Sequence, residues 1–569
     1  MRILGISSDL WLSSAALVQD GRVIAASTEE RFDRKKMSTA FPVRAIEFCL
    51  QKAGISIGDI DCAAMSWNPG IHLASASRRF LEPIRWRGEY LYSIPSFILN
   101  RFPSPEVRCI EEKLYLKDKE ISIFFIDHHK AHAANAFLLS PFKEAAILSI
   151  DGRGENETCV SAKGSGNTIE TIQSISMPHS LGLFYGALTE YLGFKADSDE
   201  WKVMALASYG KRNNPCYKKM KGIIKHDKSG GFELDLSYFS YYLFDKQPRM
   251  FTPKLTGLLG PARMKDSGIR DRHIQIAAAL QQLFEESVVK LLTGLYKQTK
   301  CRNLVLGGGC AMNSVLNGKI HSLSPFRNVF ISSCPDDSGN SVGAALYAYN
   351  CILKRANRYP CVDNFWGPDF SDDEIKDVLD KYKLKYSFHK DIPVTVARLL
   401  SRGKLVGWFQ GRMEFGQRAL GNRSILADPR NSRSKELVNR AVKYRETFRP
   451  FAPAVLEEDA HAYFDIPRGA GVPFMEKVYK VREEKRKSIP AVVHVDGTGR
   501  LQTVSRKTNP LFYSVISEFK SITGIPVVLN TSFNLNGEPI VCSPTDAIRT
   551  FISCGLDCLA MGRYLIEKE

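Results

Sequence analysis

Short apolar runs separated by turn residues open the chain and predict strands paired as hairpins. RILGISS, SAALVQ and RVIAAST follow one another, and the Asp20–Gly21 turn between the last two is a strong hairpin signal. The segment after Pro42, VRAIEFCLQKAG, has helical apolar spacing and ends at Gly54. A second strand–turn–strand pattern starts at AAILSIDGRG and continues with TCVSAKG and TIETIQSIS. Two similar starts, each leading into helices, predict a duplicated α/β unit.

Strands and helices keep alternating further along, so the pattern predicts an α/β fold for the whole chain. A long helix is expected over 273–298, followed by the strands NLVLGGG and NVFISS and by a helix in PDDSGNSVGAALYAY. Periodicity is lost in RANRYPCVDNFWGP, whose Pro and Gly content marks a linker. We therefore expect a first domain over 1–355, a linker over 356–366 and a second α/β domain over 367–569. The plan of the first domain is that of actin-like and sugar-kinase-like ATPases.

Composition changes this picture little but narrows the function. The chain has 569 residues, more than one hydrophobic core usually holds, and 44% of them are hydrophobic. It has no apolar run of the roughly 18 residues that a membrane span needs, and no signal-peptide core, so we expect a cytoplasmic protein without membrane contact. The 13 cysteines show no CxxC pair, as in a reducing compartment. The net charge of +17 suits phosphate-bearing substrates, whereas the wide spread of the basic residues disfavours nucleic acid.

A pair of histidines is the first candidate for chemistry. His128 and His132 stand four residues apart in IDHHKAHAANAF, which places both imidazoles on one face of a helix. Asp151 ends the apolar run AAILSID, where a carboxylate points toward whatever the sheet binds. Asp337, in CPDDSGNSVGAAL, offers a second carboxylate, although Asp336 and Asp337 equally suit helix N-caps. Two imidazoles and two carboxylates suit Fe(II), Mn(II) or Zn(II), and the alternative is a helix with surface histidines.

A triple glycine follows a predicted strand in LVLGGGCAMNSVLNG. Gly308 and Gly309 would let the backbone approach a ligand, and Asn313 would contact a phosphate or hydroxyl at the start of the next helix. The alternative is a tight strand–helix turn without a ligand.

The C-terminal third concentrates cations in Gly-rich segments. GRMEFGQRALGNRSILADPR and KYRETFRPFAPA combine guanidinium and ammonium groups with glycines, which predicts a cradle for phosphate. HVDGTGRLQTV adds further polar groups, and LNTSFNLNGEPIV adds a loop after a strand, for which simple turn chemistry is the alternative. The candidate residues are Arg412, Arg418, Arg423, Arg430, Lys443, Arg445, Arg449, His494, Asp496, Arg500, Ser532 and Asn534.

These motifs together resemble the O-carbamoyltransferase family that includes the nodulation-factor and tobramycin-type carbamoyltransferases. The resemblance covers essentially the whole chain, and GRMEFGQRALGNRSILADPR, RPFAPA and NTSFN carry it most specifically. It implies an N-terminal unit similar to the threonylcarbamoyl-transferase domain, with an actin-like (ASKHA) fold. That unit would hold a divalent metal, with iron expected, on His128, His132, Asp151 and Asp337. The C-terminal unit is similar to the YrdC fold, whose KxR and SxN signatures fall on Lys443, Arg445, Ser532 and Asn534.

The resemblance also implies the reaction and its partners. Carbamoyl phosphate and Mg-bound ATP would give carbamoyl adenylate in the C-terminal unit. The N-terminal unit would then transfer the carbamoyl group to a hydroxyl of a small acceptor, such as an antibiotic, a sugar or another secondary metabolite. Arg412, Arg418, Arg423, Arg449, His494, Arg500, Asn313, Gly308 and Gly309 are the residues expected to bind nucleotide or carbamoyl phosphate. The pattern allows a homodimer.

One departure from the family pattern concerns the transfer step. Trp11 stands in WLSSAAL where relatives have a histidine, as in HDASAAL, and Asp9 is the nearby group that could replace it as a base. Two other hypotheses therefore stay open: a tRNA-modifying threonylcarbamoyl transferase, and a nucleotide-binding protein with decayed transfer activity.

Overall fold

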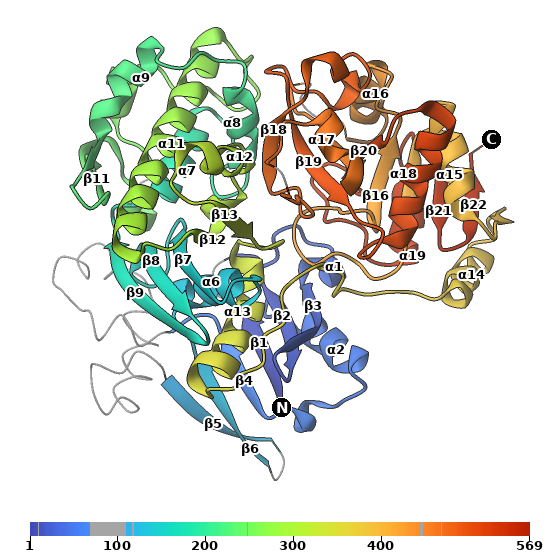
Figure 1. Cartoon of the computed structure of the whole chain (residues 1–569), viewed down its shortest axis with the longest axis horizontal. Helices are drawn as coiled ribbons and strands as arrows, with labels where there is room; N and C mark the ends of the chain where they lie inside the picture. The colour runs from blue at the N-terminus through green and yellow to red at the C-terminus, as the bar shows by residue number, and fades with distance from the viewer. Residues whose placement is uncertain are drawn as a thin grey trace. The chain divides into compact units, whose positions relative to one another are not determined.

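The computed structural model describes residues 1–8, 11–68, 110–116, 119–246, 249–443, 448–467 and 469–568. Asp9 and Arg445, two predicted catalytic residues, lie outside these ranges. The chain forms two compact units of mixed α/β structure (Figure 1). The first unit comprises 1–24, 50–313 and 319–361, and the second comprises 25–49, 314–318 and 362–569. Two short segments that precede residue 362, namely 25–49 and 314–318, therefore belong to the second unit.

The first sheet of unit 1 has the order β3-β2-β1-β4-β6-β5. Strand β1 pairs antiparallel with β2, with Ile3 opposite Val18, and parallel with β4, which is parallel to β6. The Asp20–Gly21 turn that the sequence predicts joins β2 to β3, and Gly21 has a φ of +86°. The strands are β1 (Arg2–Ser7), β2 (Ser14–Gln19), β3 (Arg22–Thr28), β4 (Cys62–Met65), β5 (Ile110–Leu116) and β6 (Lys119–Phe125).

The second sheet of unit 1 has the order β13-β12-β7-β8-β9. Strands β7, β8 and β9 are antiparallel neighbours, whereas β7, β12 and β13 are parallel. In both sheets, the first three strands in chain order are neighbours, as β3-β2-β1 in one sheet and β9-β8-β7 in the other. The first strand of each three then pairs with a parallel strand, β4 or β12. The strands are β7 (Glu144–Ile150), β8 (Glu157–Ser165), β9 (Thr168–Ser176), β12 (Asn303–Gly307) and β13 (Asn328–Ile331), and β10 (Ile224–His226) pairs separately with β11 (Phe232–Leu234).

Helices α6 (His128–Leu138) and α13 (Asn340–Leu346) follow the strands β6 and β13 and pack against each other. Small residues permit this contact: a Cβ at Gly343 would lie 2.0 Å from the carbonyl oxygen of Ala131. Helix α11 covers the predicted 273–298 stretch and extends slightly beyond it. The helices α7 (Leu181–Tyr191), α8 (Glu200–Ala207), α9 (Pro215–Met220), α10 (Pro253–Leu259), α11 (Asp271–Thr299) and α12 (Ser314–Leu323) complete the unit, although the first residues of α12 cluster with unit 2.

Unit 2 is built on a nine-stranded sheet with helices on both faces. Val406 and Trp408 of β15 face the core under α15 and α18, whereas Phe409 faces the core under α14 and α19, as alternation along a strand requires. The sheet order is β14-β22-β21-β15-β16-β20-β17-β19-β18. The strands are β14 (Ser387–Phe388), β15 (Val406–Phe409), β16 (Arg423–Ala427), β17 (Ala452–Leu456), β18 (Lys477–Lys480), β19 (Thr498–Val504), β20 (Val527–Ser532), β21 (Cys558–Met561) and β22 (Tyr564–Glu567).

The helices of unit 2 include two that come from the N-terminal segment. The predicted helix after Pro42 is α2, and its first turn is capped by Glu29, whose carboxylate accepts from the backbone N–H of Ala45 at 3.0 Å. Arg34 donates to the carbonyl oxygen of Ile540 at 2.8 Å, which explains why 25–49 clusters here. The helices are α1 (Glu30–Asp33), α2 (Val43–Lys52), α14 (Asp372–Lys381), α15 (Ile392–Ser401), α16 (Arg433–Val438), α17 (Ala460–Tyr463), α18 (Pro510–Thr523) and α19 (Pro544–Ile552). Within the described ranges, we find no helix with the length and hydropathy needed to cross a membrane.

Candidate metal centre and polar cluster

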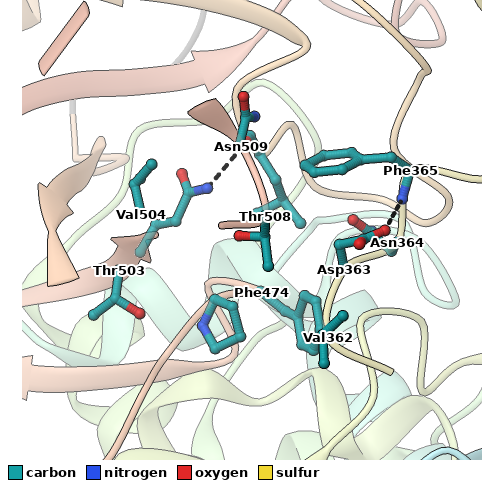
Figure 2. A pocket seen from close by; sticks show the side chains of 12 residues that line it. Val362, Asp363, Asn364, Phe365, Phe474, Thr503, Val504, Thr508 and Asn509 are labelled. Carbon is teal, nitrogen blue, oxygen red and sulfur yellow. Dashed lines mark hydrogen bonds between the residues drawn. The ribbon is translucent and has the colours of Figure 1, made fainter. Parts of the chain in front are cut away.

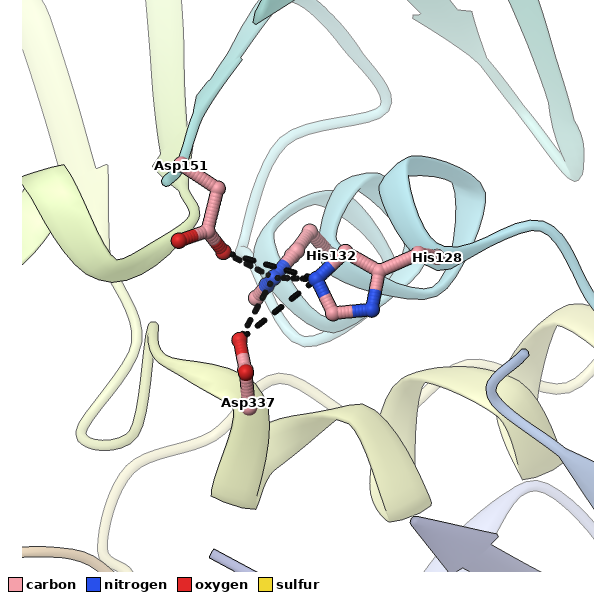
Figure 3. A group of neighbouring side chains, drawn as sticks. All are labelled: His128, His132, Asp151 and Asp337. Carbon is pink, nitrogen blue, oxygen red and sulfur yellow. Dashed lines mark hydrogen bonds and ion pairs between the residues drawn. The ribbon is translucent and has the colours of Figure 1, made fainter. Parts of the chain in front are cut away.

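Four side chains from distant parts of unit 1 converge on one point (Figure 3). His132 Nε2 lies 2.7 Å from Asp151 Oδ2 and 3.3 Å from Asp337 Oδ1. His128 Nε2 lies 3.5 Å from each of the same two oxygens and 3.0 Å from His132 Nε2. The four ligand atoms all lie within 4.8 Å of one another, and all four residues are largely buried. The structure thus brings together the four residues predicted as metal ligands.

Three of these side chains stand at the end of a regular element or beside it, and His132 lies one turn inside a helix. His128 is the first residue of α6, and His132 lies one turn later on the same face. Asp151 follows the last residue of β7, and Asp337 lies in the turn that precedes α13. Since β7 is parallel to β12 and β12 to β13, the carboxyl ends of these strands share one edge of the sheet. The topology therefore places both carboxylates beside the helix that carries the imidazoles.

The triple glycine packs directly behind this cluster. A Cβ at Gly307 would lie 2.9 Å from the carbonyl oxygen of His132, and one at Gly308 would lie 2.1 Å from that of Ile150. A Cβ at Gly309 would lie 3.1 Å from Asp151 Oδ1. Gly308 also has a φ of +85°, which favours glycine. The glycines therefore permit the four candidate metal ligands to approach one another closely. The sequence predicted only a ligand contact for these glycines and did not reveal this packing role.

The charges within the cluster depend on one another. Burial alone would raise the pKa of Asp151, but the hydrogen bonds and charges of His128 and His132 hold that pKa well below its usual value. Burial alone would lower the pKa of His132, whereas its hydrogen bonds to Asp151 and Asp337 raise it. A divalent cation would satisfy the two carboxylates and the two facing imidazole nitrogens at once. The residues present therefore fit a metal ion.

The neighbouring polar groups hold these ligands in place. His129 is not a ligand, because Ser149 Oγ and the carbonyl oxygen of Glu157 bond its two ring nitrogens at 2.8 and 3.0 Å. Burial lowers the pKa of His129 to about 3, so its ring is neutral. Asn340 Nδ2 lies 3.2 Å from His132 Nε2. Glu155, which the sequence did not single out, bonds the backbone of His128 at the start of α6. Such contacts fix ligand orientation.

Asn313, which the sequence predicts as a phosphate or hydroxyl contact, directly precedes α12. Its side-chain amide exchanges two hydrogen bonds with Gln281 of α11, at 3.0 and 3.1 Å. Gln281 also accepts from the hydroxyl of Tyr185 and donates to Glu285. Glu285 is almost fully buried and forms ion pairs with Arg212 and Lys319 at 2.7 and 2.6 Å. Asn313 is thus the edge of a buried polar network.

In unit 2, Lys443 joins the two polar residues that follow β20. Its Nζ lies 2.7 Å from Asn534 Oδ1 and 3.3 Å from Ser532 Oγ, and it donates to the carbonyl oxygen of Ser532 at 2.5 Å. Ser532 Oγ donates to Asn534 Oδ1 at 2.7 Å. Lys443 is only 4% exposed, so its ammonium group is held in a defined place. The structure therefore assembles three of the four predicted catalytic residues of this unit.

The residues predicted to bind anions differ in whether their side chains lie near other basic groups or bond the protein backbone. Burial lowers the pKa of His494 to about 4, with Asp496 raising it and the nearby charges of Arg500 and Lys435 lowering it. Arg449 is 8% exposed, and Arg418 is partly buried. Arg412, by contrast, donates to the carbonyl oxygen of Trp366 at 2.7 Å. His494, with its lowered pKa, is neutral near pH 7, so the positive charge beside it comes from Arg500 and Lys435.

Arg423 has a structural role in place of the predicted anion contact. Its side chain is fully buried and stacks on Phe409, with the guanidinium carbon 3.7 Å from the ring centroid. It donates to the carbonyl oxygens of Gln410, Pro368, Asn422 and Gly411 at 2.6, 3.0, 3.0 and 3.1 Å. Burial lowers the pKa of this arginine to about 10. Its two terminal nitrogens are thus bonded to backbone carbonyl oxygens.

We expect Arg423→Met to lower the free energy of unfolding by about 3–5 kcal/mol, because it strands several buried carbonyl groups. Chemical denaturation measures this change, and Arg506→Met, at an exposed site, should change it by less than about 0.5 kcal/mol. If Arg423→Met keeps the stability of the wild type but no longer binds carbamoyl phosphate, Arg423 binds the anion and is not structural.

A shallow pocket in unit 2 lies apart from these predicted residues (Figure 2). It spans about 290 Å³ of space, part of which is open solvent. Its lining includes none of Lys443, Ser532 and Asn534. Its polar groups serve the fold, since Asn509 donates to Asn422 and Thr503 accepts from the backbone of Val472. The lining residues are Val362, Asp363, Asn364, Phe365, Leu420, Pro473, Phe474, Gln502, Thr503, Val504, Thr508 and Asn509.

Comparison with known proteins identifies relatives along nearly the whole chain. The family model for the carbamoyltransferase N-terminus matches residues 2–346, and the model for the carbamoyltransferase C-terminus matches residues 397–568. Nodulation protein NolNO of Sinorhizobium fredii is 37% identical over 98% of this chain and 79% of its own length. Nodulation protein NolO of Bradyrhizobium diazoefficiens is 39% identical over 78% of this chain and 79% of its own length. The 3'-hydroxymethylcephem-O-carbamoyltransferase of Streptomyces clavuligerus is 29% identical over 76% of this chain and 78% of its own length.

Proposed function

The chain belongs to the carbamoyltransferase family and is a transferase, and we propose that it is an ATP-dependent O-carbamoyltransferase with a small hydroxylated acceptor. The observation that carries this proposal is the convergence of His128, His132, Asp151 and Asp337. The name of the cephem relative, which specifies carbamoyl transfer to a hydroxymethyl group, supports a hydroxyl as the acceptor. An antibiotic, a sugar or another secondary metabolite fits this description.

We also propose a fold for each of the two units. The two sheets of unit 1 share a strand plan, and this supports a duplicated actin-like fold. Helix α6, after the first sheet, carries His128 and His132, and the turn before α13, after the second sheet, carries Asp337. For unit 2 we propose a YrdC-like fold, supported by Lys443, Ser532 and Asn534, which meet at the end of β20. The proposed division is transfer in the first unit and activation in the second.

Activation is proposed to begin with carbamoyl phosphate in unit 2. Hydrolysis releases inorganic phosphate and leaves carbamate, which is a poor electrophile. A carbamate oxygen then attacks the α-phosphorus of Mg-bound ATP, the bond to the β-phosphate breaks, and pyrophosphate leaves. Lys443 would balance the charge that gathers on the phosphates, together with Arg445, which lies outside the described residues. His494, Arg500 and Arg449 are the proposed phosphate contacts. Arg449 is buried, and Arg500 lies near enough to His494 to lower its pKa.

Transfer is proposed to take place beside the cluster of unit 1. A divalent metal, for which iron is the proposal, would be held by His128, His132, Asp151 and Asp337 and would supply Lewis acidity toward a phosphate or carbonyl oxygen. The acceptor oxygen bonds to the carbamoyl carbon while the bond to AMP breaks. Asp9, outside the described residues, is the proposed base for the hydroxyl proton, since Trp11 cannot accept it.

Mass spectrometry of candidate alcohols after incubation with enzyme, ATP and carbamoyl phosphate tests this function. A gain of one carbamoyl group that requires ATP is the expected result. A carbamoylated product formed equally well without ATP would contradict the ATP-dependent route. Modification of tRNA in place of any small alcohol would instead favour the threonylcarbamoyl-transferase hypothesis.

A further inference from the structure

We propose that Glu155 is a positioning residue for the metal centre, which fixes the distance between the helix that carries the imidazoles and the loop that carries Asp151. This inference rests on the proposed metal site in unit 1. Glu155 lies in the loop between β7 and β8, four residues after Asp151, and is 2% exposed. It would act on the ligands through the backbone and would not itself touch the metal.

The carboxylate of Glu155 accepts hydrogen bonds from two backbone segments. Its Oε1 accepts from the N–H of His128 at 3.0 Å and from the N–H of Asn68 at 2.7 Å. Its Oε2 lies 3.1 Å from the same N–H of His128. His128 begins α6, and Asn68 follows β4 of the first sheet. One carboxylate from the loop between β7 and β8 therefore binds two segments that follow strands of the first sheet.

This contact takes the place of an ordinary helix cap. Asp127 is the N-cap residue of α6, but its side chain makes no capping hydrogen bond. Its carboxylate instead accepts from Asn68 Nδ2 at 2.9 Å and pairs with Lys130 at 2.7 Å. Glu155 therefore supplies the hydrogen-bond acceptor for the first turn of α6 that the N-cap side chain does not provide.

The loop geometry leaves little freedom between Glu155 and the ligands. A Cβ on Gly154 would lie 3.0 Å from the ring of His129 and 3.3 Å from Cβ of His128. The loop therefore lies directly against the first turn of α6. Any shift of Glu155 relative to His128 would change the separation of Asp151 from the imidazoles, and metal affinity depends steeply on such orientation.

The opposite end of α6 offers a matched control. Arg358 donates to the carbonyl oxygen of Phe137, in the last turn of the helix, at 2.6 Å, and its guanidinium lies 4.3 Å from the Phe137 ring centroid. A cation at the C-terminus stabilises a helix as an anion does at the N-terminus. Arg358→Ala should therefore weaken the same helix without disturbing the loop that bears Asp151.

Cobalt(II) titration of the metal-free full chain, followed by visible absorption, tests the proposal, because these bands report ligand geometry as well as affinity. We expect Glu155→Ala to bind Co²⁺ about 10–100-fold more weakly than wild type and with altered bands. Glu155→Gln keeps one acceptor oxygen, so it should lie between wild type and Glu155→Ala. Arg358→Ala should stay within about threefold of wild type, since only the distant helix end changes.

Equal losses of affinity in Glu155→Ala and Arg358→Ala would reduce Glu155 to a helix stabiliser and overturn the proposal. If Glu155→Ala does not fold, the comparison of Glu155→Gln with Arg358→Ala decides in the same way, with wild-type affinity in Glu155→Gln as the contrary result. If the wild type binds Co²⁺ tightly and Glu155→Ala binds it equally well, the positioning role of Glu155 is ruled out but the metal centre is not. Failure of the wild type to bind Co²⁺ would remove the metal centre of the proposed function as well.

Discussion

His132→Ala is expected to stop carbamoyl transfer to the acceptor while carbamoyl-dependent release of pyrophosphate from ATP continues. His132 Nε2 is the atom closest to both carboxylates of the cluster, so its removal takes one of four converging ligands from the proposed metal. A loss of about 1,000-fold in the transfer rate, or roughly 4 kcal/mol of barrier, is the expected scale. Mass spectrometry of the acceptor and a pyrophosphate assay measure the two half-reactions separately.

The control for this variant is His321→Ala, which removes an exposed histidine of α12 and should leave both half-reactions unchanged. Loss of pyrophosphate release in His132→Ala together with loss of transfer would contradict the proposed division of labour. So would a His132→Ala enzyme that carbamoylates the acceptor at the wild-type rate.

Lys443→Ala is expected to abolish carbamoyl-dependent pyrophosphate release, with a loss of about 1,000-fold, and therefore to stop transfer too. Its ammonium group is buried against Ser532 and Asn534 and would have to bind the phosphates of ATP as charge accumulates on them. Metal binding in unit 1 should be unaffected, because Lys443 belongs to the other unit. The assay is pyrophosphate release with and without carbamoyl phosphate.

Lys507→Ala, which removes an exposed lysine of the same unit, is the matched control and should behave as wild type. If Lys443→Ala keeps normal pyrophosphate release but loses transfer, Lys443 serves the second step and the assignment of the adenylate site is wrong. Ser532→Ala should share the defect of Lys443→Ala, since Ser532 Oγ lies 3.3 Å from the ammonium nitrogen.

The local patterns that sequence reasoning could use are those with a fixed period or a fixed place in an element. The four-residue step from His128 to His132 specifies one helix face, and an aspartate at the end of a buried strand, as Asp151 is, lies at the binding edge of a sheet. These two rules, applied to residues on α6 and β7, anticipated the cluster that the structure assembles. The Asp20–Gly21 turn and the helix after Pro42 followed from equally local chemistry.

Long-range contacts to the backbone could not be predicted in this way, because they produce no periodic pattern in the sequence. Glu155 binds the N–H groups of Asn68 and His128, and no periodicity connects these three positions. Arg423 looked like its neighbours in a Gly-rich loop, yet its guanidinium is used by backbone carbonyls that only the folded chain brings together. The placement of 25–49 in the second unit depends on contacts such as that of Arg34 with Ile540, more than 500 residues away.

The path of the carbamoyl oxygens tests the central claim most directly. Carbamoyl phosphate labelled with oxygen-18 on both oxygens bonded to its carbon is turned over by the wild-type enzyme with ATP, and the AMP formed is analysed by mass spectrometry. If carbamate attacks the α-phosphorus and the carbamoyl carbon is later released to an alcohol, AMP must carry the label. Unlabelled AMP, or a carbamoylated product formed without AMP, would contradict the account.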